Sequence, residues 1–398
     1  MSNQALSGIK VLDVGHSVSG PYCTKLLADF GAEVIKVENP CGGDPSRQMG
    51  PFPDDIPCDE ASAFFLYLNN NKKSITLNLE SNSGKSIFKK LVQQADILVE
   101  NFSPGLMAKL GLDYKKLKKI NPGLIMTSIS NFGQTGPYKD YKGTDLVVQA
   151  LSGLIWSRGY PQREPVMAAS GQRYTEFVGG MFAATATMTA YFSRLQNGIG
   201  QQVDISLLEA CTSVMPPGYS FNTWPDNQPV PGSRISFTPS VEKCKDGYVG
   251  INCLTGQHWA DICTLMGMED KTEEWSTQAV RIANRQEVLD RMAPYLMART
   301  KNEIFEEGQA WRIPVAPVAN VEDLVNSPQF KARDYMVEVD YPVAGKQVQP
   351  GPLGKMSESP GKLSSPAPLL GQHNAEIYGK LLGYGKEDMV RLNRSGII

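Results

Sequence analysis

Short apolar runs alternate with helix-like segments through the first third of the chain, and this alternation most limits how it can fold. The strand-like runs are residues 9–15, 33–38, 74–80, 96–102 and 123–133. Between them, residues 21–31, 84–95 and about 104–111 carry apolar side chains at helical spacing. Alternating strands and helices predict a parallel sheet covered on both faces, which is an α/β fold.

The rest of the chain predicts further helices and a second, smaller domain. Residues 145–158 and 176–196 have a helical pattern, and residues 201–215 begin as a strand and continue as a helix. Residues 217–240 are rich in Pro, Gly, Asn and Ser, which indicates a linker. The block 219–321 has the pattern of a smaller α+β domain. The tail from residue 322 is Pro-rich and partly extended, with a short helix near 374–383.

Composition excludes several classes of function. The 398 residues carry a net charge of −2, which lacks the basic excess of a nucleic-acid-binding protein. No run of apolar residues is long enough to span a membrane, and the N-terminus lacks the pattern of a secretory signal. The seven Cys include no C-x-x-C pair, and there are only three His. We therefore predict a cytoplasmic protein with reduced thiols, no metal site, and no nucleic-acid or membrane partner.

The first strand is followed by the loop GHSVSG, residues 15–20, which leads into a helix. A Gly-rich turn in this place can bind a phosphate on its backbone N–H groups. A dinucleotide site needs G-x-G-x-x-G and an acid about twenty residues further on. Glu38 stands near the place of that acid, but the middle glycine is missing. The loop is therefore either a tight turn or a weak match to an NAD-dependent oxidoreductase.

Lysines and one carboxylate are the remaining candidates for chemistry. Lys72, Lys73, Lys109 and Lys142 lie near the ends of predicted elements, where they would either face solvent or bind a phosphorylated cofactor as point charges. Glu176 precedes Val-Gly-Gly, and the two glycines allow another backbone or a ligand to come close. A carboxylate so placed is a helix cap, a salt-bridge partner or a covalent nucleophile.

Seven segments, taken in order, resemble the class III CoA-transferases, also called the CaiB/BaiF family. They include GIKVLDVGHSVSGPYCTKLLADFGAEVIKVENPCGGDPSR (8–47), YLNNNKKSITLNL (67–79) and SNFGQTGPYKDYKGTDLVVQALSG (130–153). The others are residues 95–114, 198–210, 311–342 and 366–376. The resemblance implies a large Rossmann-like domain built from residues 1–218 and the return segment 322–398, a small domain in 219–321, and an interlocked dimer. It also implies that the first loop binds CoA rather than NAD.

The resemblance also assigns roles to individual residues. The family uses an active-site Asp that attacks an acyl-CoA thioester and then carries CoA as a thioester before an acceptor acid receives it. Glu176 stands in the place of that Asp. The resemblance implies CoA contacts from His16, Ser17, Val18 and Ser19, phosphate contacts from Lys72, Lys73 and Lys109, and a contact beside the active site from Lys142.

The chain departs from the family pattern at two places. The first leaves two alternatives for its function open, and the second argues against a related activity. The extra methylene of Glu176 moves the carboxylate by about 1 Å, and such a shift can cost roughly 10²-fold in rate. The chain is therefore either an active transferase or a non-catalytic or impaired subunit of a heteromer of the benzylsuccinate CoA-transferase type. A sister branch of racemases has a G-H-D triplet where this chain has Gly143, Thr144 and Asp145, so one of the two bases for proton exchange is missing. The sequence does not identify the acyl donor or the acceptor.

Overall fold

The computed structural model describes residues 4–155, 173–214 and 237–398, and these divide into two compact units. The larger unit contains residues 4–155, 173–214 and 332–398, and the smaller contains 237–331. Most of the predicted linker and the end of the helix predicted over 145–158 lie outside the described residues. The boundaries at 218 and 321 stay predictions of where separately folding domains begin and end.

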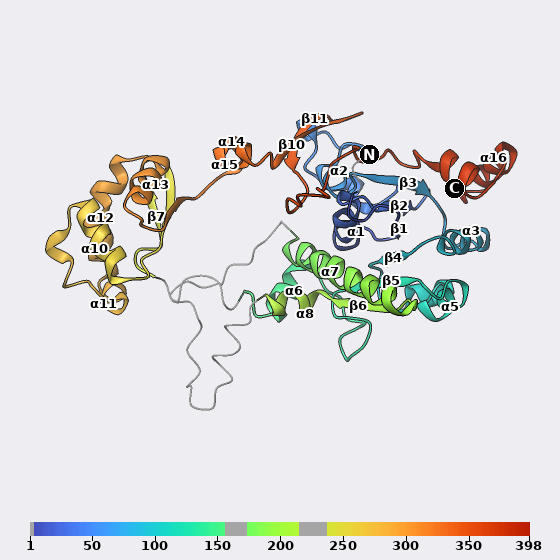
Figure 1. The fold of residues 1–398 in the computed structure, drawn as a ribbon, viewed down its shortest axis with the longest axis horizontal. Coiled ribbons are helices and arrows are strands. Elements are labelled where there is room, and N and C mark those ends of the chain that lie inside the picture. The colour runs from blue at the N-terminus through green and yellow to red at the C-terminus, as the bar shows by residue number, and fades with distance from the viewer. Residues whose placement is uncertain (1–3, 156–172, 215–236) are drawn as a thin grey trace. The chain divides into compact units, whose positions relative to one another are not determined.

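A six-stranded parallel sheet forms the centre of the larger unit (Figure 1). Its strands, in spatial order, are β3 (Lys72–Thr76), β2 (Glu33–Glu38), β1 (Lys10–Asp13), β4 (Ile97–Glu100), β5 (Ile125–Ser130) and β6 (Gln202–Ser206). Every neighbouring pair is parallel. This order is that of the Rossmann fold, with the reversal between β1 and β4. The predicted Rossmann-like sheet is therefore confirmed.

Helices cover both faces of this sheet. Side chains on successive strand residues point to opposite faces, so each strand contributes to two cores. Leu12 belongs to a core shared with α3 (Asn82–Val92), α5 (Tyr114–Ile120) and the π-helix η4 (Ala375–Leu381). Its neighbour Val11 belongs to the core on the other face, with α1 (Ser19–Asp29), α7 (Tyr174–Asn197) and α8 (Leu207–Ser213). The strands are apolar because they are buried from both sides.

The remaining elements of the larger unit surround this sandwich. They are η1 (Pro45–Gln48), η2 (Pro53–Asp55), α2 (Ala63–Leu68), α4 (Leu106–Leu110), α6 (Asp145–Leu151), β10 (Met336–Tyr341), β11 (Gly345–Pro350) and α16 (Lys386–Arg394). The last three differ from expectation, because β10 and β11 form an antiparallel hairpin in a tail predicted only as extended, and α16 was not predicted. The third strand begins at Lys72, two residues before the predicted start at 74, so Lys72 and Lys73 lie within it.

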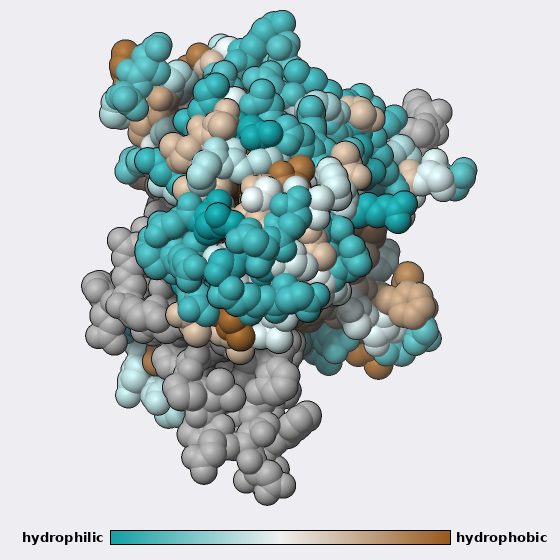
Figure 2. Space-filling model, turned by 90° about the vertical axis from the view of Figure 1, so that its left-hand side faces the viewer, coloured by the Kyte–Doolittle hydropathy of each residue, from teal (hydrophilic) through white to brown (hydrophobic). Residues whose placement is uncertain are grey.

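The smaller unit is an antiparallel sheet with helices, in agreement with the predicted α+β class. Its strands are β7 (Val241–Cys244), β8 (Gly247–Ile251) and β9 (Val315–Pro317). Its helices are α10 (Gly256–Met266), η3 (Glu269–Lys271), α11 (Gln278–Ala283), α12 (Arg285–Ala298), α13 (Lys301–Ala310), α14 (Val321–Asn326) and α15 (Pro328–Ala332). Trp259 and Trp275 are fully buried in its core. The side of the molecule in Figure 2 is mainly hydrophilic. Within the described ranges, no helix combines the length and the apolar character that crossing a bilayer requires.

Candidate functional site

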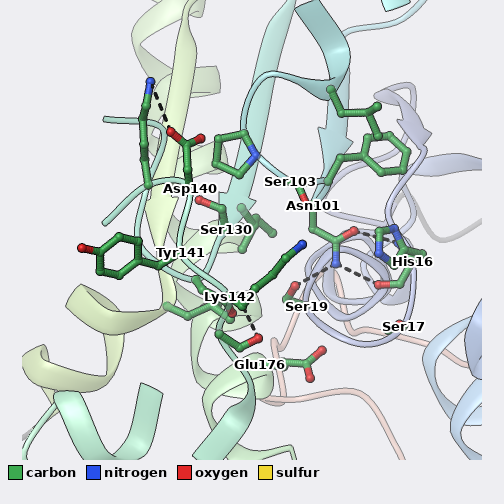
Figure 3. A pocket seen from close by; sticks show the side chains of 18 residues that line it. His16, Ser17, Ser19, Asn101, Ser103, Ser130, Asp140, Tyr141, Lys142 and Glu176 are labelled. Atoms are coloured by element: carbon green, nitrogen blue, oxygen red, sulfur yellow. Dashed lines mark hydrogen bonds and ion pairs between the residues drawn. The ribbon is translucent and has the colours of Figure 1, made fainter. Parts of the chain in front are cut away.

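A cavity of about 430 Å³ opens at the carboxyl ends of β1, β4 and β5 (Figure 3). In open parallel sheets, ligand sites form at this edge where the strand order reverses. The cavity is lined by His16, Ser17, Ser19, Asn101, Lys142 and Glu176, among others. A second cavity of about 300 Å³ lies at the ends of β2 and β3 and shares His16, Phe102 and Leu106 with the first. The two cavities therefore adjoin each other at these three residues.

Two glycines shape the loop that separates β1 from α1. A Cβ atom on Gly15 would come within 2.9 Å of the Gly20 Cα, and a Cβ on Gly20 would come equally close to the Gly15 Cα. Only glycine fits such a close approach of two backbone segments. Ser17 lies between them with φ of 59°, and its N–H donates to Asp44 at 2.9 Å. The glycine spacing therefore serves the tight turn.

Asn101, the residue after β4, holds this loop with three hydrogen bonds. Its Oδ1 accepts from the His16 N–H at 2.8 Å. Its Nδ2 donates to the His16 carbonyl at 2.8 Å and to the Ser19 hydroxyl at 2.9 Å. Since the amide uses both of its ends, the loop is held in one position against the end of β4. Figure 3 shows this clamp beside the cavity.

A buried charge network lies beneath the same loop. The Lys36 ammonium donates to the Gly15 carbonyl at 3.0 Å and pairs with Asp44 at 2.6 Å. The Lys72 ammonium pairs with Asp13 at 2.9 Å and also donates to the Pro21 carbonyl and the Asn69 amide oxygen. Burial lowers the pKa of Lys72 to about 8. All these charges are paired, which is the usual condition for burying a charge.

Glu176 lies in the first turn of α7, and its side chain is 16% exposed. Its Oε1 accepts from Arg173 Nη1 at 2.7 Å. Burial raises the pKa of Glu176, while Arg173 and the Val18 N–H act in the opposite direction. The positive end of a helix dipole favours a carboxylate at this position. Glu176 is therefore a partly desolvated acid whose charge is balanced by one guanidinium.

The two glycines after Glu176 allow α7 to pack against α1 and α8. A Cβ on Gly180 would come within 2.9 Å of the Ser19 carbonyl, and one on Gly179 would come within 2.0 Å of the Leu207 side chain. Larger residues would push α7 away from both helices. This contact places the start of α7, and with it Glu176, beside the loop after β1. The Val-Gly-Gly sequence thus has a packing function that positions the acid.

The predicted lysines fall into different surroundings. Lys142 lines the first cavity, and in Figure 3 its side chain extends into it. It forms no ion pair with any part of the chain that the structure describes. Lys109 is exposed on α4, near Leu106 and Leu110 of the second cavity. Lys73 pairs with Glu33 and Glu376 at 2.9 Å each, and neither it nor the buried Lys72 lines either cavity.

Sequence reasoning missed two residues that shape the site, Asn101 and Arg173, and it named a third, Asp145, without its contact to α7. Asn101 directly follows a buried strand, and a polar residue at a strand end could have indicated it. Arg173 stands three residues before Glu176, a spacing that allows an ion pair on a helix. Asp145 accepts from the N–H and the hydroxyl of Thr175 at 2.9 and 2.7 Å, which anchors the start of α7. Nothing in the local sequence indicates that last contact.

Burial affects two further titratable groups beside the cavities. It lowers the pKa of His16, so this imidazole is neutral at pH 7. Its ring lies against Phe102, with centroids 5.4 Å apart. Burial raises the pKa of Glu100 to about 7. This carboxylate accepts from the Phe102 N–H at 2.8 Å and so supports the turn that carries Asn101.

Comparison with known proteins gives one family. The profile of CoA-transferase family III matches residues 6–374. The alpha subunit of succinyl-CoA–L-malate CoA-transferase from Chloroflexus aurantiacus is 32% identical over 99% of this chain and 92% of its own length. The mouse succinyl-CoA:glutarate CoA-transferase is 32% identical over 100% of this chain and 91% of its own length.

A solved structure agrees with these relatives. The crystal structure of a CaiB/BaiF family protein from Brucella suis superimposes with a TM-score of 0.84 at 30% identity. The match covers 95% of this chain and 100% of that protein. Matches in sequence and fold therefore extend over nearly the whole chain. The chain belongs to CoA-transferase family III, the CaiB/BaiF family, and is a CoA-transferase.

Proposed function

We propose that this chain transfers CoA from an acyl-CoA to a carboxylic acid with Glu176 as covalent nucleophile. The observation that carries the proposal is the position of Glu176 at the cavity. Asp140 also lines the cavity, but its carboxylate is 74% exposed, against 16% for Glu176. A partly desolvated carboxylate beside backbone donors is suited to attack on a thioester.

The reaction follows from the chemistry of one carboxylate. The Glu176 carboxylate attacks the acyl carbon of the donor, which forms a mixed anhydride and releases CoA as thiolate. The thiolate attacks the Glu176 carbonyl, which forms an enzyme thioester and releases the donor acid. The acceptor carboxylate attacks the carbonyl of that thioester, which forms a second mixed anhydride and releases CoA as thiolate. The thiolate then attacks the acceptor's carbonyl carbon, which yields the new acyl-CoA and restores the Glu176 carboxylate. Each step exchanges one acyl bond for another, so no further reactant is needed.

The loop from His16 to Ser19 supports these steps. Its Val18 N–H favours the charged form of the Glu176 carboxylate, and the same donor is available to the oxyanion that forms when the Glu176 carbonyl is attacked. The loop cannot withdraw, because Asn101 holds it at His16 and Ser19. A neutral His16 leaves the developing negative charge to these fixed donors rather than to a mobile cation.

The two cavities fit the shape of CoA, which has a nucleotide at one end and a thiol at the other. We assign the thiol end to the first cavity, beside Ser17, Ser19 and Lys142, and the nucleotide end to the second. Lys109 is near enough to the second cavity to meet a phosphate as a point charge. Contacts of Lys72 and Lys73 with CoA stay predictions. The three donors of the Lys72 ammonium are already used within the chain.

The relatives narrow the proposal on substrates and assembly. Those named above act on succinyl-CoA with malate or glutarate, so we propose a dicarboxylic acid as one substrate of this chain.

We also propose a cytoplasmic, interlocked dimer. The alternative is a heteromer in which this chain is an impaired subunit. It is favoured by the Glu in place of Asp and by the alpha-subunit relative. No observation in the structure favours the NAD-dependent alternative over CoA.

A trapping experiment tests the nucleophile. The purified chain is incubated with succinyl-CoA, its intact mass is recorded, and hydroxylamine or borohydride then marks the modified peptide. We expect the mass of one CoA on Glu176, lost in Glu176→Gln and kept in Asp140→Asn. An unmodified Glu176 with every donor tried, together with full activity of a native complex that carries Glu176→Gln, would refute catalysis by this chain. Counting the distinct chains of the native complex decides between the homomer and the heteromer.

A further inference from the structure

Arg173 occupies an unusual position directly before α7. Its backbone is left-handed, with φ of 48° and ψ of 41°, a conformation that is uncommon for a residue with a side chain. Its guanidinium is 2.7 Å from Glu176 Oε1, and its side chain is 39% exposed. The residue therefore combines a strained backbone with a cation that touches the proposed nucleophile, and such strain often occurs at functional sites.

Another acid beside the start of α7, Asp145, does not explain why Arg173 is there. Asp145 Oδ1 accepts from the Thr175 N–H and hydroxyl, and its Oδ2 accepts from Gln149 at 2.6 Å. Both oxygens of Asp145 are thus engaged by neutral donors. Within the described residues, Arg173 forms its ion pair with Glu176. The guanidinium has five N–H donors, so in the part of the chain that the structure describes this one pair leaves donors for a second carboxylate.

The charge of Glu176 changes during the proposed reaction, and this changes what Arg173 can bind. In the resting chain, the carboxylate and the guanidinium neutralise each other. Once Glu176 carries CoA as a thioester, it has lost its negative charge and its carbonyl oxygen is a weaker acceptor. Arg173 is then a cation without its partner, next to the carbon that an acceptor carboxylate must attack.

We propose that Arg173 binds the carboxylate of the acceptor acid when Glu176 is held as the thioester, and directs that carboxylate at the Glu176 carbonyl. This inference rests on the proposed function and extends it to the recognition of the second substrate. A planar guanidinium matches a carboxylate through two parallel hydrogen bonds, which Lys142 with its point charge cannot provide. In the last step the Glu176 carboxylate reforms and pairs with Arg173 again. The guanidinium is then no longer available to bind a free acid.

The test separates the two half-reactions. Arg173→Asn keeps a residue that tolerates a left-handed backbone, and Arg173→Lys keeps the charge without the fork. The enzyme thioester is first formed with succinyl-CoA and measured by intact mass. Glutarate is then added in increasing concentration, and the loss of the CoA mass is followed in a single turnover.

We expect Arg173→Asn to form the thioester, with the half-saturating acyl-CoA concentration changed by less than about threefold. The half-saturating glutarate concentration rises by roughly 10- to 100-fold, as the loss of a charged hydrogen bond predicts. Arg173→Lys lies between this variant and the wild type. Arg391→Asn removes another arginine that pairs with an acid three residues away, Asp388, on α16, and it should resemble the wild type.

Three outcomes would overturn the inference. An unchanged dependence on glutarate in Arg173→Asn removes the role in acceptor binding and leaves Glu176 as nucleophile. An equal loss of thioester formation and discharge shows that Arg173 only positions Glu176. A wild-type chain that forms no thioester overturns the proposed function, and the inference falls with it.

Discussion

Asp13 and Glu100 end neighbouring strands of the same sheet and are both buried, yet their surroundings give them different charges. At the end of β1, burial opposes ionisation of Asp13, but Lys36 and Lys72 outweigh it and lower the pKa of the acid. At the end of β4, burial raises the pKa of Glu100 to about 7. Its hydrogen-bond partners, the Ser128 hydroxyl and the Phe102 N–H, are neutral and offset this rise only in part. The cations around an acid therefore decide its charge here, since both acids are buried.

Glu176 lies between these two cases. Its side chain is 16% exposed, so it is less buried than Glu100, and among the described residues it pairs with one cation, Arg173, where Asp13 has two. Its cation is also partly exposed, whereas Lys36 and Lys72 are fully buried. An acid with one accessible counter-charge can exchange that partner during a reaction, and an acid locked between two buried ammonium groups cannot. We therefore expect a substitution of Asp13 to change the free energy of unfolding and a substitution of Glu176 to change the rate of thioester formation.

The largest effect is expected from Asp13→Asn. The substitution leaves Lys72 buried without a carboxylate and removes one of the two acids near Lys36. Removing one partner of a buried ion pair typically costs about 3–5 kcal/mol. We expect that loss in the free energy of unfolding, measured by urea denaturation. Glu33→Gln, which removes an exposed acid from Lys73, is the control and should change stability by less than about 1 kcal/mol. Equal effects in the two variants would break the comparison.

Glu176→Asp tests the other side of the comparison. The shorter acid restores the residue type that the family resemblance implies, but the local backbone holds the longer one. We expect a change of roughly 10²-fold in the rate of thioester formation, since about 1 Å of displacement is enough for such an effect. The free energy of unfolding should change by less than about 0.5 kcal/mol. A large loss of stability with an unchanged rate would make Glu176 a structural residue.

Glu100→Gln gives a pH-dependent effect on stability. A folded-state pKa above the unfolded value means that the folded state binds more protons between about pH 4.5 and 7. The wild type should therefore lose stability relative to the variant as the pH rises through this window. We expect Glu100→Gln to gain about 3 kcal/mol on the wild type between pH 4.5 and pH 8, measured by denaturation at each pH. A difference that does not vary with pH would show that folding does not change the pKa of Glu100.

The parallel sheet was predictable because its strands are apolar runs separated by helical patterns, and β2 matches its predicted range of 33–38. The start of β3 was missed because Lys72 looks polar in sequence, and its burial depends on partners that include Asp13, 59 positions earlier. The hairpin β10–β11 was missed because its few apolar residues alternate with exposed polar residues and because it lies in a Pro-rich tail. Glu176 was found through a local pattern. The position of Asn101 after a buried strand is a weaker local signal, and its partner His16, 85 positions away, could not be predicted from it.

The smallest effect is expected from Lys73→Gln, which tests a lysine that the sequence places near CoA. Its ammonium already contacts Glu33 and Glu376, and all three side chains are about one-third exposed or more. Exposed pairs contribute about 0–1 kcal/mol because water and salt screen them, so stability should fall by less than that. The KM for succinyl-CoA should rise by less than about threefold, since both carboxylates compete with a phosphate for the ammonium. A tenfold rise that disappears at high salt would show instead that Lys73 leaves its acids to bind the substrate.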